Sequence, residues 1–130
     1  MLESFLFLAL TIFHEARNQD FVDQLAVGHV ILNRAESKPI KEIVLKDKQF
    51  SCYNNGVKFP DDGKAFLTSM HVAWRVLQGK DFTGGATYYH TKKVKPHWRK
   101  KVSYVGDFGD HKFYKDIVRI KAERRKVYVN

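Results

Sequence analysis

The sequence predicts a single α+β domain, mainly helical, with a small sheet or hairpin in its second half. Apolar residues recur at helical spacing as far as Gln78, and short β-prone runs separated by glycines follow that point. The chain has 130 residues, enough for one modest core, and its single cysteine, Cys52, excludes an internal disulfide. We therefore expect packing to stabilise the fold.

The first helix is expected over residues 2–17, where six apolar side chains form one stripe: Leu2, Phe5, Leu6, Ala9, Phe13 and Ala16. Glu15 lies beside this stripe, one turn after Thr11 and Ile12, so its carboxyl should border the core. The opening run carries Glu3, has no early Lys or Arg, and contains no small-residue cleavage site. We therefore interpret it as a mature helix, too short for a bilayer span of roughly 20 residues.

A second helix is expected over Phe21–Arg34, because Asp20 is a favourable N-cap and the helical pattern resumes after it. Four residues should share its buried face: Leu25, Ala26, His29 and Leu32. Pro39 then suits the first turn of a short third helix that ends near Leu45. Two long helices packed together therefore begin the domain.

The pattern changes around a fourth helix, expected over Lys64–Gln78 and stopped by Gly79. Before it, Lys46–Pro60 has no clear period and is predicted to be a long irregular loop, a kind of segment that is often functional. After it, we expect a turn and strand at 83–90 and strands at 101–105 and 111–114, with Gly106 and Gly109 between the last two.

Positive charge is unevenly distributed along the chain. There are 23 Lys and Arg against 14 Asp and Glu, a formal net charge of +9. From Lys92 to Lys101 every charged residue is basic, and His97 and Trp98 lie among them. This pattern favours a surface that binds a polyanion. Residues 119–130 are expected to form a basic tail, a solvated helix or a frayed end, after a domain at 1–118.

Glu15 is a lone carboxylate near the end of an otherwise apolar helix. A carboxyl at such a border stays protonated closer to neutral pH, which suits a general acid. The pattern by itself fits a solvated helix residue near Arg17 better. Further motifs are needed to separate the two interpretations.

Five segments of the chain resemble, in order and spacing, the motifs of the spore cortex-lytic cell wall hydrolase family. They are Phe13–Arg17, Gln24–Arg34, Gln49–Cys52, Thr83–His90 and Gly109–Tyr114. Single motifs of this kind occur by chance, whereas five in register are specific. The resemblance implies cleavage of the β-1,4 bond between MurNAc and GlcNAc in peptidoglycan, by a fold distantly similar to lysozyme and lytic transglycosylases. It also implies that Glu15 is the catalytic acid.

The resemblance places substrate-binding residues in the loop and in the second half of the chain. They are Gln49, Phe50, Ser51, Gly85, Thr87, Tyr88, Tyr89, His90, Trp98 and His111. Loop residues such as Gln49 and Ser51 suit hydrogen bonds to sugar hydroxyls, although loop capping explains them equally. The aromatic residues fit sugar platforms or core packing. Each of the two histidines fits either an orienting role or a structural one.

Two motifs depart from the family pattern. The glutamate motif continues as Asn18-Gln19, where the family commonly has Gly-Glu, so we infer that a second acid there is not needed. Asp110 replaces the asparagine of a Gly-Asn-His motif. Because the sequence shows no export signal or wall-binding module, the resemblance suggests a monomeric bacteriophage endolysin, made in the host cytoplasm and released through a separate pore to lyse the cell.

Glycosidic cleavage needs an acid for the leaving oxygen and a group to meet the oxocarbenium-like centre. Hydrolases use a second carboxylate, but the other candidate acids lie in turn-like or capping contexts: Asp20, Asp23, Asp81, Asp107 and Asp110. We therefore expect Glu15 to act alone, as acid and then as base, without a metal or other cofactor. This is the reaction of a lytic transglycosylase, with a hydrolytic muramidase or glucosaminidase as the alternative.

Two other functional classes fit parts of the sequence. A zinc-dependent amidase would use His90, His97 and His111, since three imidazoles suit catalytic zinc, but there is no H-E-x-x-H motif. A nucleic-acid-binding protein would explain the charge of residues 92–101, but no nucleic-acid-binding motif accompanies it. We expect no nucleic acid as partner, and assign residues 92–101 to peptidoglycan glycan strands or anionic outer-membrane lipid.

Overall fold

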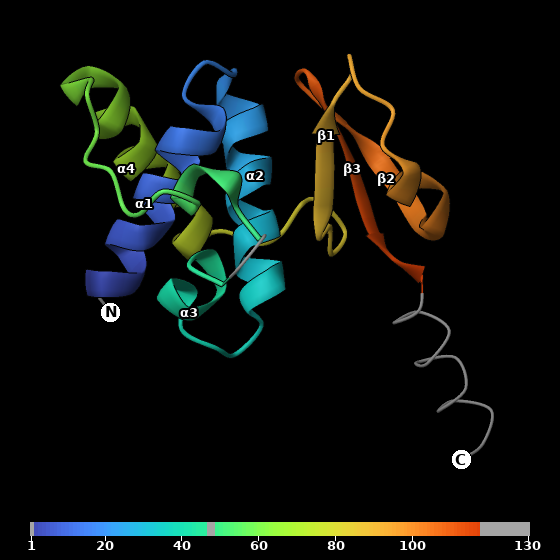
Figure 1. Ribbon diagram of the computed structural model, residues 1–130, viewed down its shortest axis with the longest axis horizontal. Coiled ribbons are helices and arrows are strands. Elements are labelled where there is room, and N and C mark those ends of the chain that lie inside the picture. The colour runs from blue at the N-terminus through green and yellow to red at the C-terminus, as the bar shows by residue number, and fades with distance from the viewer. Residues whose placement is uncertain (1, 47–48, 118–130) are drawn as a thin grey trace.

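The computed structural model describes residues 2–46 and 49–117, which form a helical half and a sheet half side by side (Figure 1). The α-helices are α1 (Leu2–Ala16), α2 (Phe21–Ala35), α3 (Ile40–Val44) and α4 (Gly63–Gln78). Short 3-10 helices are η1 (Ser51–Tyr53) and η2 (His97–Lys101). The strands are β1 (Tyr88–Thr91), β2 (Val102–Phe108) and β3 (His111–Asp116). The mainly helical α+β class expected from the sequence is therefore confirmed.

The four helices lie within a residue or two of their predicted positions. Asp20 caps α2 as expected, because its carboxylate accepts a hydrogen bond of 2.9 Å from the Asp23 backbone N–H. Asp62 caps α4 in the same way, accepting from the Ala65 N–H at 3.1 Å. The irregular loop that begins at Lys46 is interrupted by η1.

Helix α2 is more completely buried than its predicted single face implied. It packs against α1, α3, α4 and β2, so Gln24, Val27 and Ile31 are buried as well as Ala26 and His29. The predicted face residues Leu25 and Leu32 are only half-buried. Periodicity missed this arrangement because it describes one apolar stripe, whereas a central helix contacts neighbours on several sides.

The sheet contains three antiparallel strands in the order β1-β3-β2. Gly106 was predicted to lie between two strands, and this was wrong. It lies within β2, at a bulge where the register shifts between Tyr104 and Gly106. The chain instead reverses at Gly109 and Asp110, where Gly109 has a φ of 63°, a conformation that glycine adopts without strain.

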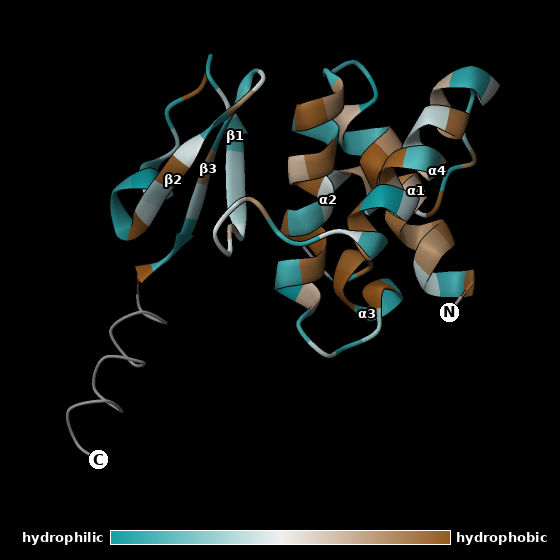
Figure 2. Ribbon diagram, turned by 180° about the vertical axis from the view of Figure 1, so that it is seen from behind, coloured by the Kyte–Doolittle hydropathy of each residue, from teal (hydrophilic) through white to brown (hydrophobic). Residues whose placement is uncertain are grey.

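The two halves differ in character. Hydrophobic residues are concentrated in the helices, whereas the strands are mostly polar or intermediate (Figure 2). Phe113 and Ala86 are the fully buried contributions of the second half to the main apolar core. Polar contacts complete the join, since the buried Asp23 of α2 pairs with His111 of β3 at 2.7 Å. Asn33 of α2 donates to the Ala86 carbonyl at 2.9 Å.

Two further sequence-based expectations concern the C-terminal tail and the absence of a membrane-spanning helix. The basic tail expected at 119–130 lies outside the described residues, so the division at residue 118 stays a prediction. Among the helices of residues 2–46 and 49–117, none is both long and apolar enough to cross a bilayer.

Gly28 sets the approach of α1, α2 and α4, and a side chain there should be destabilising. A Cβ at this position would lie 2.7 Å from Val76 Cγ2 and 3.2 Å from Ile12 Cδ1. We expect Gly28→Ala to lower the free energy of unfolding by about 1–3 kcal/mol, because overpacking outweighs the gain in helix propensity. Urea denaturation measures the change.

Gly63→Ala is the matched control for this substitution. A Cβ on Gly63, the first residue of α4, meets nothing within 4 Å. The control should be neutral or slightly stabilising. A Gly28→Ala protein as stable as the parent would contradict the close helix packing.

Candidate active site

Glu15 lies in the last turn of α1, half-buried, where the helical half meets β1. As predicted, it borders the core, since Thr11 and Ile12 one turn earlier are fully buried. Burial raises the pKa of the Glu15 carboxyl above its ordinary value of 4.5. Hydrogen bonding from Tyr89 and the charges of Arg34, His111 and His14 oppose this rise without cancelling it. The environment therefore favours a protonated carboxyl.

Tyr89 is the immediate partner of Glu15 from the sheet half. Burial raises the pKa of the Tyr89 hydroxyl well above its usual value, and the adjacent Glu15 carboxylate adds to the rise. The phenol therefore stays neutral and can donate a hydrogen bond to the carboxyl. Its ring lies against His111 at 5.1 Å and Phe113 at 5.7 Å between centroids. Packing thus limits the positions that the hydroxyl can adopt.

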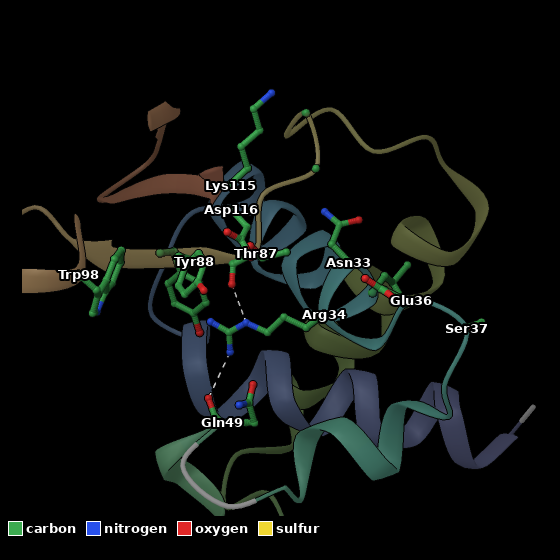
Figure 3. Close-up of a pocket in the computed structure, with 14 residues that line it drawn as sticks. Asn33, Arg34, Glu36, Ser37, Gln49, Thr87, Tyr88, Trp98, Lys115 and Asp116 are labelled. Atoms are coloured by element: carbon green, nitrogen blue, oxygen red, sulfur yellow. Dashed lines mark hydrogen bonds between the residues drawn. The ribbon is translucent and has the colours of Figure 1, made fainter. Parts of the chain in front are cut away.

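A groove with a volume of about 1060 Å³ lies between the helical half and the sheet (Figure 3), and Tyr89 is one of its lining residues, whereas Glu15 is not. Its walls come from the end of α2, the start of the 49–51 segment, the turn before β1 with the first residues of β1, the start of η2 and the end of β3. The lining residues are Leu32, Asn33, Arg34, Glu36, Ser37, Gln49, Gly84, Gly85, Thr87, Tyr88, Tyr89, Trp98, Lys115 and Asp116. Its volume and polar lining suit an extended polar ligand such as a few linked sugars.

Arg34 crosses the middle of the groove and connects its walls (Figure 3). Its Nε donates to the Thr87 carbonyl at 2.6 Å and its Nη1 to the Gln49 carbonyl at 3.2 Å. The guanidinium also lies 4.8 Å above the Phe50 ring. Burial lowers the pKa of Arg34, while Tyr89 and Glu15 act in the opposite direction. Arg34 therefore places a positive charge near the Glu15 carboxyl.

The turn that forms one rim of the groove is organised by Asp81. Its carboxylate accepts from the Thr83 N–H at 2.8 Å, the Thr83 hydroxyl at 2.6 Å and the Gly85 N–H at 2.9 Å. Burial acts to raise the pKa of Asp81, but these hydrogen bonds outweigh it and the net shift is downward. Gly84 and Gly85 have φ values of 66° and 89°, which favour glycine.

The structure brings six of the ten expected substrate-binding residues to the groove: Gln49, Gly85, Thr87, Tyr88, Tyr89 and Trp98. Tyr88 and Trp98 face each other with ring centroids 5.3 Å apart and form an aromatic wall. These positions are compatible with sugar contacts, and the binding roles stay predictions.

The other four expected residues lie elsewhere. Phe50 is buried beneath Arg34, and Ser51 is an exposed residue at the start of η1. His90 is buried and bonded through Nε2 to the Tyr114 hydroxyl at 2.8 Å. His111 is buried and bonded to Asp23. The geometry of Phe50, His90 and His111 favours support of the groove over direct contact with a ligand.

Sequence reasoning did not single out Arg34, Glu36, Lys115 and Asp116 as site residues, although all four line the groove. A signal for Arg34 was present, because it is the one Lys or Arg of the predicted helix over Phe21–Arg34. Lys115 and Asp116 carry no comparable signal. They reach the groove only because β3 lies between β1 and β2.

The acids considered as second catalytic groups have other partners or positions. Asp23 is fully buried against His111, Asp20 caps α2, and Asp81 holds the 83–85 turn. Asp107 and Asp110 lie exposed on the hairpin formed by β2 and β3. Two carboxylates that were not considered, Glu36 and Asp116, do line the groove.

The three histidines of the zinc hypothesis are not gathered into a site. Within residues 2–46 and 49–117, no three His, Cys, Asp or Glu side chains are placed to hold a metal ion. His97 is exposed in η2, whereas His90 and His111 are bonded to Tyr114 and Asp23. No observation in this part of the chain favours the zinc-dependent class.

Comparison with known proteins agrees with this arrangement. Residues 18–114 match the model of the Cell Wall Hydrolase family. The chain is 32% identical over 90 residues to the spore cortex-lytic enzyme of Halalkalibacterium halodurans, an alignment that covers 63% of this chain and 25% of that enzyme. The chain belongs to the cell wall hydrolase family, as its five motifs implied. It spans about a quarter of the length of this curated relative.

Two solved structures share the fold. The catalytic domain of the Bacillus cereus SleB protein superposes with a TM-score of 0.73 and 21% identity, over 88% of this chain and 91% of that domain. The catalytic domain of the germination-specific lytic transglycosylase SleB from Bacillus anthracis gives 0.74 and 21%, over 88% and 96%. The lysozyme-like fold that the motifs implied is therefore confirmed. The family match begins three residues after Glu15, so the role of Glu15 depends on its surroundings.

Glu15 should reduce stability at neutral pH, because its pKa is raised in the folded protein. The stability associated with its protonated form is fully present below the unfolded value near 4.5 and is lost as pH rises through the folded value. We therefore expect Glu15→Gln to be more stable than the parent at pH 7, with the difference shrinking towards pH 4. Thermal unfolding at a series of pH values measures this.

Glu42→Gln is the control, because Glu42 is an exposed residue of α3. Its effect should be small at every pH. A Glu15→Gln protein whose relative stability does not change with pH would show that burial does not perturb this carboxyl.

Proposed function

We propose that this chain cleaves peptidoglycan glycan strands at the β-1,4 bond between MurNAc and GlcNAc, with Glu15 as the acid. The observation that carries the proposal is a half-buried carboxyl with a raised pKa whose partners Tyr89 and Arg34 line a sugar-sized groove. Family membership supplies the substrate class, and the groove supplies a place for the strand. The raised pKa keeps a larger fraction of Glu15 protonated near neutral pH, as a general acid requires.

The proposed reaction is that of a lytic transglycosylase. Glu15 transfers its proton to the glycosidic oxygen as the bond from that oxygen to MurNAc C1 breaks. The carboxylate then takes the proton of the MurNAc C6 hydroxyl, and the C6 oxygen bonds to C1. The products are a 1,6-anhydro-MurNAc end and a free GlcNAc hydroxyl, and Glu15 is protonated again. Tyr89 and Arg34 stabilise the carboxylate between the two steps.

The charge balance at Glu15 fits a residue that acts as acid and then as base. Burial favours the protonated form, whereas Tyr89, Arg34 and His111 favour the carboxylate. A strongly raised pKa would make Glu15 a weak acid, and an ordinary one would leave little of it protonated at neutral pH. Because burial favours the protonated form and the neighbouring groups favour the carboxylate, Glu15 is suited to act first as the acid and then as the base.

A hydrolytic muramidase or glucosaminidase is the second candidate, and the acidic lining of the groove gives it a specific basis. Glu36 and Asp116 both line the cavity, on walls formed by the end of α2 and the end of β3. A carboxylate there could activate water or meet the oxocarbenium-like centre. Substitution distinguishes this candidate from the single-acid reaction.

The mass of the released muropeptides should identify the reaction. Purified peptidoglycan treated with the protein should release fragments with 1,6-anhydro ends, lighter by one water molecule than the hydrolysis products, because the C6 hydroxyl replaces water. Mass spectrometry before and after borohydride reduction distinguishes the two ends, since only a reducing end gains hydrogen. Reducible MurNAc or GlcNAc ends would instead establish the hydrolase.

Replacing the proposed acid should abolish lysis without loss of the fold. Glu15→Gln is expected to lower the rate of turbidity loss from purified walls by about 10²–10⁴-fold, the usual contribution of a general acid. Glu36→Gln and Asp116→Asn are the matched controls, and each should retain catalytic turnover with at most a weaker apparent affinity. If either control lost as much activity as Glu15→Gln, the single-acid reaction would be wrong.

We also propose that the basic segment 92–101 holds the anionic wall. Lys93, Lys95, Lys100 and Lys101 are exposed in the connection between β1 and β2, and Lys92 is near Asp107 at 3.6 Å. Trp98 of the same segment lines the groove, so the charge lies beside the proposed glycan site. Contact with anionic outer-membrane lipid, the monomeric state, and an endolysin role with release from the host cytoplasm stay predictions.

Reversing this charge should weaken binding to the wall. We expect the combined Arg99→Glu, Lys100→Glu and Lys101→Glu variant to sediment less with purified peptidoglycan, and the loss to shrink as salt rises, because salt screens exposed charges. The control reverses Lys41, Lys64 and Arg75, exposed residues of α3 and α4 in the helical half of the molecule (Figure 1). Equal loss in both variants would mean that net charge alone matters.

A further inference from the structure

Glu15 is one end of a series of side-chain contacts whose other end is Asp23 of α2. Asp23 of α2 is fully buried and lies 2.7 Å from His111 Nδ1. The His111 ring meets the Tyr89 ring edge to face, with centroids 5.1 Å apart. Tyr89 in turn hydrogen-bonds with Glu15. Four elements, α2, β3, β1 and α1, each contribute one residue to this series.

The Asp23 carboxylate is held more firmly than an ordinary ion pair requires. Both of its oxygens lie within 2.8 Å of His111 Nδ1, and the Asp110 backbone N–H donates to Oδ2 at 3.2 Å. Gly109 fits against it so closely that a Cβ there would lie 2.8 Å from Asp23 Cβ. A buried carboxylate is costly unless its partners are fixed. The β2–β3 turn is therefore shaped around Asp23.

We propose that Asp23 and His111 are positioning residues for the proposed reaction: they hold Tyr89 against Glu15 and provide positive charge on the side of the carboxyl that faces the sheet. This inference rests on the proposed function only in taking Glu15 to be the catalytic acid. The contacts among Asp23, His111 and Tyr89 stand on geometry, and the interaction of Tyr89 with the Glu15 carboxyl is the last link.

Other charged and titratable groups also face Glu15, and they separate into two kinds. Arg34 from α2 and His14 from α1 favour the carboxylate, as His111 does. Burial raises the pKa values of Cys52 and Tyr53 from η1, to about 12 for Cys52, and the nearby Glu15 carboxylate adds to both rises. Arg34 is a fixed cation, whereas His111 is held in place by its buried partner Asp23.

The direct test is NMR titration of the Glu15 carboxyl in protein labelled with ¹³C-glutamate, with the Glu15 signal assigned by its loss in Glu15→Gln. Tyr89→Phe removes the hydrogen bond, and Asp23→Asn removes the buried counter-charge of His111. In both variants the midpoint of the Glu15 titration should move to higher pH, because each substitution removes an interaction that favours the carboxylate form. Combining Asp23→Asn with His111→Gln keeps a hydrogen-bonded pair without charge, and should give the same shift.

His29→Gln is the matched control. His29 is another buried histidine of α2, but it faces Asp81 at 3.9 Å and is not among the groups that act on Glu15. This variant should lose stability without moving the Glu15 midpoint. A purely structural role for Asp23 and His111 would give the same result as the control, and an unmoved midpoint in folded Tyr89→Phe and Asp23→Asn proteins would overturn the inference.

Activity measurements separate this inference from the function on which it draws. If the parent protein releases muropeptides and needs Glu15, the alkaline limb of its kcat/KM profile should move to higher pH in Tyr89→Phe and Asp23→Asn. If the variants release muropeptides but neither the alkaline limb of kcat/KM nor the midpoint of the Glu15 titration moves, the positioning role is wrong and the proposed function stands. A shifted midpoint in a protein that releases nothing from peptidoglycan would support the coupling and contradict the proposed function.

Discussion

The buried pair of Asp23 and His111 joins the two halves of this protein, and the groove depends on that join. The helical half has a continuous apolar core, whereas the small sheet contributes few fully buried apolar side chains. A carboxylate that pairs with a histidine and a backbone N–H at 2.7–3.2 Å supplies directional contacts where apolar area is limited. Because these contacts fix the β2–β3 turn, they also fix Tyr89 on the neighbouring strand.

Arg34 performs a related task on the other side of Glu15. It joins the end of α2 to the segment that holds Gln49 and to the turn before β1, through carbonyls at 2.6 and 3.2 Å. Its positive charge opposes the effect of burial on the Glu15 carboxyl. One side chain therefore connects the walls of the groove and adjusts the acid beside it. Replacement by Lys would keep the charge but lose the paired geometry.

Stability and chemistry place opposite demands on Glu15. A half-buried carboxyl reduces folding stability once it ionises, and an amide in its place would avoid that cost. The position is useful for acid catalysis for the same reason that it is unfavourable for folding, because partial desolvation makes the proton available near neutral pH. The surrounding Tyr89, Arg34 and His111 limit the cost by stabilising the carboxylate.

The sequence alone determined the helices, the Asp20 cap, the family and the candidate acid. These depend on local chemistry: the carboxylate of Asp20 at a helix start, the apolar stripe beside Glu15, and motifs in register. Only the tertiary structure decided which residues line the groove. Lys115 and Asp116 reach it because β3 is the central strand, and Phe50 leaves it because Arg34 covers the ring. Contacts between distant segments leave no periodic trace in a sequence, so they follow from packing alone.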